Sequence, residues 1–211
     1  MSGKILVFAE HQDGKLVRPA FEALAAAQDL SRHSGGAVSA VILGSGISAL
    51  ACELARLKVS EVLVVDSPPL REYTPDGYAL ALRALIEQRK PEWVIFSHTY
   101  LVRDFAPKLA AAMNRGLISD CLGYRCEGGE MTFVRQVFQG KFNADVQPLG
   151  EAPYLVSFQA GSFREDSLER AELPAQVTPV PVDLPSGAIR TTPGERFREA
   201  KQSVDLGQAE I

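Results

Sequence analysis

Polar side chains gather where the apolar run WVIFS passes into a helical pattern. Ser97, His98 and Thr99 come first, and Arg103 and Asp104 follow shortly after. In α/β proteins, the carboxyl end of a strand that opens onto a helix N-terminus is the usual place for chemistry. Arg103 could bind an anion there, and Asp104 could cap the helix. In the alternative, which we favour, both residues only hold the scaffold.

A second candidate is the turn Gly44–Ser45–Gly46, which follows a strand pattern and precedes a helical one. Backbone N–H groups in such a turn can cradle a phosphate. The dinucleotide fingerprint requires a third glycine, where this chain has Ala49, and an acid after the next strand, where Asp66 fits loosely. The candidate residues of a nucleotide-type crevice are Gly44, Ser45, Gly46, Thr99 and Arg103.

Other sites have less support. The histidines, His11, His33 and His98, lie far apart, and no cluster has metal-ligand spacing, so we expect no metal. There is no GxSxG motif for a nucleophilic serine, and we expect no catalytic residue. A net charge of −4 without a basic run argues against a nucleic-acid partner. No apolar run approaches the roughly 20 residues of a membrane span.

The totals indicate an ordinary globular protein. The 211 residues are 46% hydrophobic and 23% charged, which suits one large domain or a domain with an appendage. The three cysteines form no CxxC motif, as is typical of a reducing compartment. The start, MSGKILVFAE, is typical of a strand and unlike a signal peptide. We therefore expect a cytoplasmic protein.

The elements that must position the candidate residues alternate over the first 120 residues. Short apolar runs predict strands at 4–10, 37–44, 61–66 and 93–97. Helical spacing between and after them predicts helices at 17–33, 47–58, 74–90 and 103–114, with Pro107 in the first turn of the last. This alternation predicts an α/β fold, with a doubly wound, mainly parallel sheet and helices on both faces.

Residue 118 marks a change of pattern. Two strands around Gly128–Gly129 predict a hairpin, and two more strands follow, so 118–163 should form an antiparallel extension. Five of the 13 prolines then lie within 174–193, which favours an extended, exposed path. We interpret 1–173 as an α/β domain and 174–211 as a linker, in which 177–184 could still lie along a sheet edge.

Several blocks, taken in order, resemble the N-terminal domain of the electron transfer flavoprotein alpha subunit. The blocks are SHT and RD–PKLA within 97–110, ISDC at 118–121, FVRQVFQGK at 133–141, VSFQAGSF at 156–163 and SVDLGQAEI at 203–211. The chain departs from the family's pattern at Val102, where glycine is usual, at Gln136, where proline is common, and at Gln159, where arginine is common.

The resemblance implies a specific role. In that family a heterodimer of alpha and beta subunits carries electrons from flavin-linked dehydrogenases to a quinone reductase or another acceptor. FAD lies between the alpha subunit's C-terminal domain and the beta subunit, and AMP belongs to the beta subunit. The N-terminal domain is a Rossmann-like scaffold, similar to adenine-nucleotide hydrolases in fold, that packs on the beta subunit. The resemblance further implies that the FAD-binding domain would begin after Ile211, that this chain by itself binds no FAD, and that its crevice is vestigial.

Two alternatives stay open from the residues. The first is a stand-alone adenine-nucleotide-binding module, in which 44–46 and 97–104 hold the ligand. The second, which we rank below it, is a hydrolase of a small nucleotide, because the sequence shows no pair of nucleophile and base.

Overall fold

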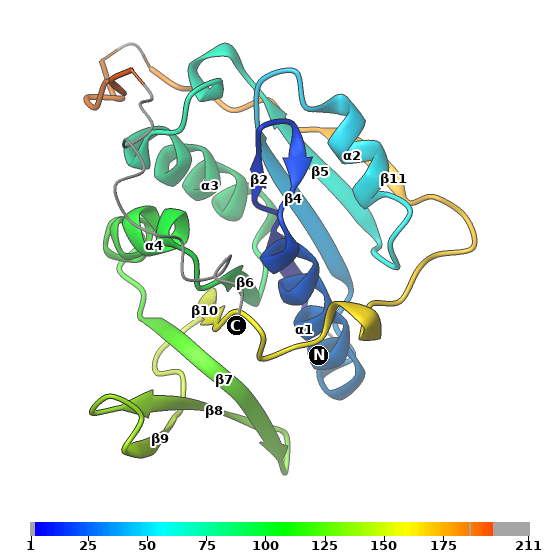
Figure 1. Ribbon diagram of the computed structural model, residues 1–211, viewed down its shortest axis with the longest axis vertical. Helices are drawn as coiled ribbons and strands as arrows, with labels where there is room; N and C mark the ends of the chain where they lie inside the picture. Colours follow the sequence, from blue (N-terminus) through cyan, green and yellow to red (C-terminus); the bar gives the residue numbers. More distant parts are fainter. Residues whose placement is uncertain (1–2, 186, 196–211) are drawn as a thin grey trace, which may run out of the picture.

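The computed structural model describes residues 3–185 and 187–195, and the block at 203–211 lies outside them. Over this part of the chain, the main sheet has nine strands in the order β11-β5-β4-β1-β6-β10-β7-β8-β9 (Figure 1). The strands are β1 (Ile5–Phe8), β4 (Val38–Gly44), β5 (Glu61–Asp66), β6 (Trp93–Ser97), β7 (Leu117–Glu127), β8 (Glu130–Val137), β9 (Phe142–Val146), β10 (Tyr154–Phe158) and β11 (Gln176–Pro179).

Seven of these strands, from β11 to β7 in the sheet order, pair in parallel, and β8 and β9 add antiparallel pairs at one edge. Two short strands, β2 (His11–Gln12) and β3 (Lys15–Leu16), form a separate hairpin. The helices are α1 (Arg18–Ser34), α2 (Ser48–Leu54), α3 (Pro75–Arg89) and α4 (Tyr100–Ala112), with 3-10 turns η1 (Pro68–Leu70) and η2 (Glu165–Ser167). The predicted α/β fold class is confirmed.

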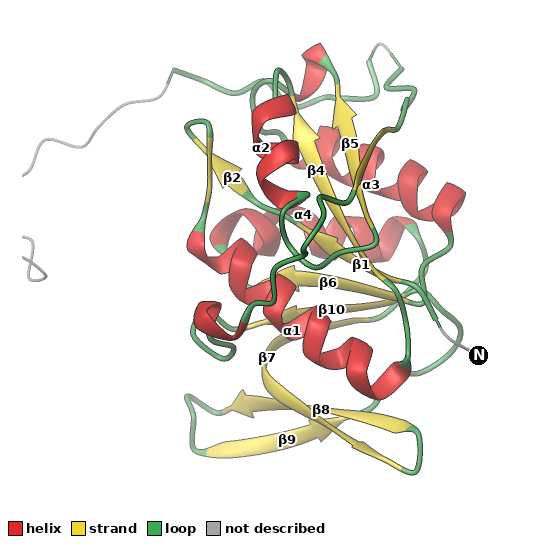
Figure 2. Ribbon diagram, turned by 90° about the vertical axis from the view of Figure 1, so that its right-hand side faces the viewer, coloured by secondary structure: helices red, strands yellow, loops and turns green. Residues whose placement is uncertain are grey.

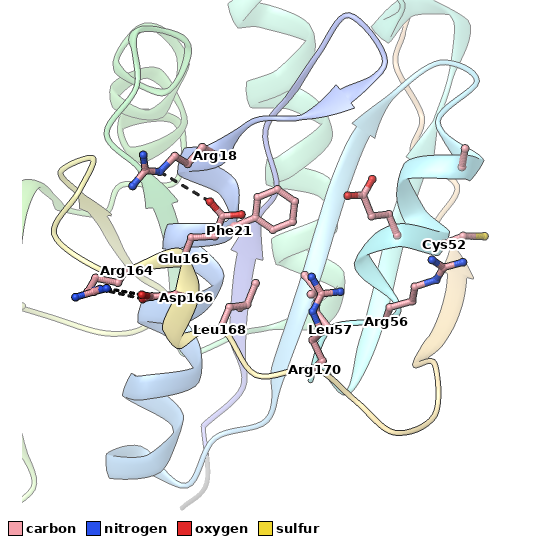
Figure 3. Close-up of a pocket in the computed structure, with 12 residues that line it drawn as sticks. Arg18, Phe21, Cys52, Arg56, Leu57, Arg164, Glu165, Asp166, Leu168 and Arg170 are labelled. Carbon is pink, nitrogen blue, oxygen red and sulfur yellow. Dashed lines mark hydrogen bonds and ion pairs between the residues drawn. The ribbon is translucent and has the colours of Figure 1, made fainter.

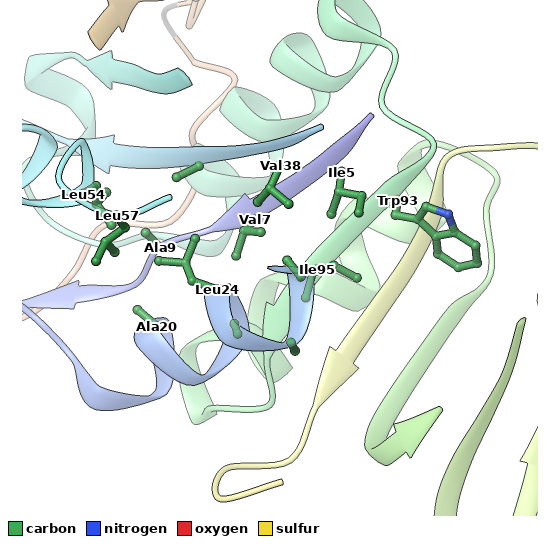
Figure 4. Packing of buried hydrophobic residues seen from close by; sticks show 14 of the residues in the cluster. Ile5, Val7, Ala9, Ala20, Leu24, Val38, Leu54, Leu57, Trp93 and Ile95 are labelled. Carbon is green, nitrogen blue, oxygen red and sulfur yellow. The ribbon is translucent and has the colours of Figure 1, made fainter. Parts of the chain in front are cut away.

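Helices cover both faces of the parallel strands, as Figure 2 shows, with α1 and α2 on one face and α3 and α4 on the other. Strand β1 explains why: all four of its residues are buried, and successive side chains point to opposite faces. Ile5 and Val7 pack towards Leu24 of α1 (Figure 4). Leu6 and Phe8 belong to the second core, under α3 and α4.

The helix ends mostly follow local sequence signals. Helix α1 ends at Gly35, whose φ of 69° suits glycine and whose N–H donates to Ser31 O. Helix α3 begins after Thr74, whose side chain accepts from Gly77 N. Helix α2 ends at Leu54, earlier than the expected 58.

The prediction for the start of α4 is wrong. The helix begins at Tyr100 and not at 103, and Pro107 lies inside it and not in its first turn. Thr99, five residues before Asp104, supplies the cap, because its Oγ1 accepts from Val102 N at 3.2 Å.

The antiparallel extension is only partly as predicted. The hairpin of β7 and β8 is confirmed, and the two strands turn at Gly128–Gly129. Strand β10 does not extend this region, since it pairs in parallel with both β6 and β7. Its sequence, YLVSF, is almost wholly buried, and a central place in the sheet is what removes both of its faces from water.

The first part of the proline-rich segment packs against the α/β domain. Strand β11 pairs in parallel with β5 at the sheet edge, so the expectation for 177–184 is confirmed for its first part, up to Pro179. Val180 is buried, and Val182 and Leu184 pack against the core under α3 and α4. The segment therefore gains apolar burial that offsets part of the entropy of ordering it.

Candidate functional site

A cavity of about 800 Å³ lies at the carboxyl ends of the central parallel strands. Its lining comes from the segments 10–14, 45–50, 71–78 and 99–101, which follow or adjoin the ends of β1, β4, β5 and β6. Strand β1 lies between β4 and β6. The chain continues from β1 to β4 on one side and later crosses to β6 on the other side, and ligands of open α/β sheets bind at such a switch point. The structure thus brings Ser45, Gly46 and Thr99 to one cavity, as the sequence predicts.

The phosphate-cradling groups of this cavity already have a partner. The carboxylate of Asp66, at the end of β5, accepts from Gly46 N at 2.9 Å and from Ile47 N at 3.3 Å. A phosphate would have to displace this carboxylate and would meet its negative charge. Gly44 has a packing role, since an added Cβ would lie 2.7 Å from Ile47 Cγ2 and 3.0 Å from His11 Nε2.

An acidic side chain, that of Glu10, also lies at the switch point. Thr99 Oγ1 donates to Glu10 Oε2 at 2.5 Å, and this bond joins the ends of β1 and β6. Burial raises the pKa of the Glu10 carboxyl above its ordinary value, while the bond from Thr99 and the nearby His11 oppose that rise. Glu10 thus lines the crevice and Asp66 holds the N–H groups of its turn, so two carboxylates take the polar contacts that the phosphates of a nucleotide would need.

Arg103 and Asp104 do not contribute to this cavity. Asp104 does not cap α4; it lies within the helix and accepts from the Tyr73 hydroxyl at 2.8 Å. The Arg103 guanidinium lies over the ring of Tyr100, 5.5 Å from its centroid, and lines a different cavity. Thr99 and Arg103 are close in sequence but serve separate places, since Thr99 is the extended N-cap that lines the first cavity and Arg103 lies within α4 and lines another.

We expect Thr99→Ala to lower the free energy of unfolding by about 1–2 kcal/mol, because α4 loses its N-terminal cap and Glu10 loses a donor. Asp104→Ala removes only a bond between exposed groups and should cost about 0.5 kcal/mol. Urea unfolding of both variants measures the difference. Equal losses, or a larger loss for Asp104→Ala, would return the capping role to Asp104.

A second cavity, of about 380 Å³, holds side chains that sequence reasoning did not connect. His98 follows β6, Ser157 lies on β10, and Asp120 lies in β7 with a φ of 61°. His98 Nδ1 is 3.0 Å from Ser157 Oγ, which also accepts from Asp120 N at 3.1 Å. His98 Nε2 lies 3.9 Å from Asp120 Oδ1.

This Ser–His–Asp group has the composition of a catalytic triad but not its accessibility. Ser157 is only 1% exposed, so a substrate carbonyl cannot approach its hydroxyl. Burial lowers the pKa of the His98 imidazole; Asp120 opposes this effect, and the charges of Arg103 and Arg135 add to it. The network therefore holds a neutral imidazole and joins β6, β10 and β7.

Nothing in the spacing of His98, Asp120 and Ser157 marks them in the sequence, because they come from three strands. Only the insertion of β10 between β6 and β7 brings the three residues together. Arg135 reaches the same cavity from β8, which makes it a further residue that sequence reasoning missed.

A third cavity, of about 960 Å³, lies between α1, α2 and the segment that contains η2 (Figure 3). Four arginines line it: Arg18, Arg56, Arg164 and Arg170. All four are exposed. Arg18 pairs with Glu165 at 3.8 Å and Arg164 pairs with Asp166, so acids of the same segment offset part of this charge. None of the residues predicted from the sequence lies here.

No group of three or more His, Cys, Asp or Glu side chains within 3–185 and 187–195 is arranged to hold a metal ion. Among the helices in that same part of the chain, none combines the length and the apolar character that crossing a membrane requires.

Comparison with known proteins gives a consistent result. The family of electron transfer flavoprotein domains matches residues 5–184. The electron transfer flavoprotein subunit alpha of Bacillus subtilis (strain 168) is 33% identical over 211 residues, which cover all of this chain and 63% of that protein. The alpha subunit of Thermoanaerobacterium thermosaccharolyticum is 32% identical over 212 residues, which cover 98% of this chain and 63% of that protein.

A relative with a different name extends this result. The acryloyl-CoA reductase electron transfer subunit beta of Anaerotignum propionicum is 28% identical over 233 residues, which cover 98% of this chain and 63% of that protein. The chain thus spans about 63% of the length of these curated relatives.

Proposed function

Because the chain belongs to the electron transfer flavoprotein family and corresponds to the N-terminal part of its alpha subunits, we propose that it is a scaffold and partner-binding domain of such a subunit. In this proposal it packs on a beta subunit and helps to form a heterodimer that carries electrons between flavin-linked dehydrogenases and a quinone reductase or another acceptor. The FAD of that heterodimer is held outside residues 1–211, and AMP is held by the beta subunit. The name of the Anaerotignum propionicum relative, an electron transfer subunit of a reductase, supports this class of role.

The scaffold role is supported by the hydrogen bonds that the chain's own side chains make at the switch-point crevice. The N–H groups of its turn donate to Asp66, and Thr99 donates to Glu10 between the ends of β6 and β1. The chain's own side chains therefore take the places that a nucleotide would need, which supports a vestigial crevice. The proposed role does not include catalysis, because Ser157, the serine of the Ser–His–Asp group, is buried.

The proposed place of action is the cytoplasm. The thiols of Cys52, Cys121 and Cys126 are free, although Cys52 is exposed, and such usage suits a reducing compartment. Burial also raises the pKa of the Cys121 thiol to about 12, so this cysteine behaves as a small apolar side chain and not as a reactive thiolate.

Co-expression with an electron transfer flavoprotein beta subunit tests the proposal. We expect a 1:1 complex by size-exclusion chromatography with light scattering, and we expect the chain alone to be colourless. An unrelated flavodoxin-like domain of similar size is the control for non-specific association. A stoichiometric flavin absorbance in the chain alone would contradict the scaffold role, and failure to form a complex would contradict the role in partner binding.

An adenine-nucleotide-binding module is the second candidate, because the 800 Å³ cavity has the size and the place of a ligand site. Calorimetric titration distinguishes the two candidates. For a scaffold, AMP and ATP should give no more heat than inorganic phosphate at the same concentration. Tighter binding of AMP than of phosphate would favour the module, and binding should then strengthen in Asp66→Asn, which removes the opposing charge.

A further inference from the structure

The 380 Å³ cavity beside His98 contains two arginines without an anionic partner. Arg103 and Arg135 both line it, from α4 and β8 respectively. Within residues 3–185 and 187–195, neither guanidinium has a carboxylate at ion-pairing distance, and the π face of Tyr100 is the contact that Arg103 makes. Two such groups facing one small cavity repel each other unless an anion lies between them.

Arg135 adds an independent observation. Its Nε atom is buried from solvent and has no hydrogen-bond partner among the described residues. A buried donor of a charged group without an acceptor is costly and requires an explanation, for which a bound ion is a recognised one. By contrast, the four arginines of the cavity in Figure 3 are exposed, so water can satisfy their donors.

The remaining lining supplies neutral donors and one opposing charge. When the Ser157 hydroxyl donates to His98 Nδ1, the proton of the neutral imidazole is on Nε2, which lies beyond hydrogen-bond distance of Asp120 Oδ1 at 3.9 Å. Within residues 3–185 and 187–195, no acceptor lies at hydrogen-bond distance from this N–H. The Asp120 carboxylate offsets one of the two guanidinium charges, which leaves the cavity with one net positive charge.

We propose that this cavity binds a small oxyanion, phosphate or carboxylate, through the guanidinium groups of Arg103 and Arg135 and the imidazole N–H of His98. Guanidinium groups recognise the paired oxygens of both anions through charge-assisted hydrogen bonds. The site is separate from the switch-point crevice, and the proposal does not depend on electron transfer. It places an anion where the carboxyl ends of β6 and β10 lie beside the first residues of β7.

The test measures the melting temperature of the 211-residue chain against rising inorganic phosphate, sulfate or acetate, with sodium chloride at equal ionic strength as the control for screening. We expect a saturable rise with the oxyanions and none with chloride. A response to phosphate and sulfate alone assigns the site to tetrahedral anions, and a response to acetate alone assigns it to carboxylates. If no oxyanion gives a saturable rise, the proposal is wrong.

Four variants make the test specific. Arg135→Gln and Arg103→Gln should each weaken binding by about tenfold or more, through loss of a charge-assisted bond. Arg103 is exposed, so its variant keeps the test valid if Arg135→Gln does not fold. Asp120→Asn should strengthen binding, because the opposing charge is lost and asparagine tolerates the positive φ.

Arg125→Gln is the matched control. Arg125 lies on β7 of the same sheet extension, but it pairs with Asp145 and does not line the cavity. Its variant should bind as the unaltered chain does. Equal affinity in Arg103→Gln, Arg135→Gln and Arg125→Gln would show that the anion binds elsewhere and would overturn the proposal.

Discussion

Replacing Phe105 by alanine should lower the free energy of unfolding by about 3–5 kcal/mol, the range for removing a buried aromatic ring from a core. Phe105 is fully buried on the inner face of α4. Its ring centroid lies 5.3 Å from that of Phe8, 6.0 Å from Tyr78 and 5.9 Å from Phe96, so one substitution leaves a cavity where α3, α4 and the sheet meet.

Phe142→Ala is the control for this loss. Phe142 is 64% exposed on β9, and its contact with Phe138 lies at the surface. The same change should therefore cost less than about 1 kcal/mol. Guanidinium unfolding of both variants, with the slopes compared, measures the two losses. Similar losses would mean that α4 is not packed on the sheet as described, and the positions of Thr99 and Arg103 would have to be reconsidered.

Asp76→Ala should have the second large effect, a loss of about 2–4 kcal/mol. Asp76 is 4% exposed near the start of α3 and forms an ion pair with Lys108 of α4. Its Oδ2 also accepts from Arg190 N at 2.9 Å and from Thr191 N at 3.1 Å. One buried carboxylate thus ties two helices to the segment that follows β11.

Limited proteolysis shows which part of the chain becomes less stable in Asp76→Ala. In the unaltered chain, we expect the protected fragment to include β11 and to extend to about Thr191. In Asp76→Ala, early cuts should move to the stretch between β11 and Thr191, because its backbone loses the acceptor that holds it. Asp145→Ala, which breaks an exposed ion pair with Arg125, should leave the cuts unchanged. An unchanged pattern in Asp76→Ala would show that Val180 and its apolar neighbours hold the segment without the carboxylate.

The two cavities at the polar cluster 97–104 differ in the charge of their side chains. At the switch-point crevice, the carboxylates of Glu10 and Asp66 accept hydrogen bonds from Thr99 and from the turn N–H groups, whereas Arg103 and Arg135 line the cavity beside His98. The two cavities lie on either side of the start of α4, and Thr99 and Arg103 each serve one of them. The polar cluster at 97–104 therefore divides into a part that holds the scaffold and a part that lines the proposed anion site.

Most of the helices and strands of the main sheet, and the α/β fold class, follow from local sequence patterns. The run ILVF predicts a strand buried on both faces, because apolar residues on successive positions leave no polar side for water. Gly128–Gly129 predicts the turn of β7 and β8, and Thr74–Pro75 predicts the start of α3. These signals act over a few residues, so they can be recognised without knowing what lies nearby in space. The start of α4 and the end of α2 are local exceptions; for α4, both Thr99 and Asp104 are acceptable caps.

Which side chains meet depends on the order of the strands in the sheet. The order of strands places Asp66 against the turn at 44–46, although twenty residues separate them, and so fills the cradle that the turn sequence suggested. It also inserts β10 beside β6, which brings Ser157 to His98 and completes the cavity with Arg135. The physical reason is that backbone patterning depends on neighbours along the chain, whereas a site depends on contacts between strands whose order the local pattern does not specify.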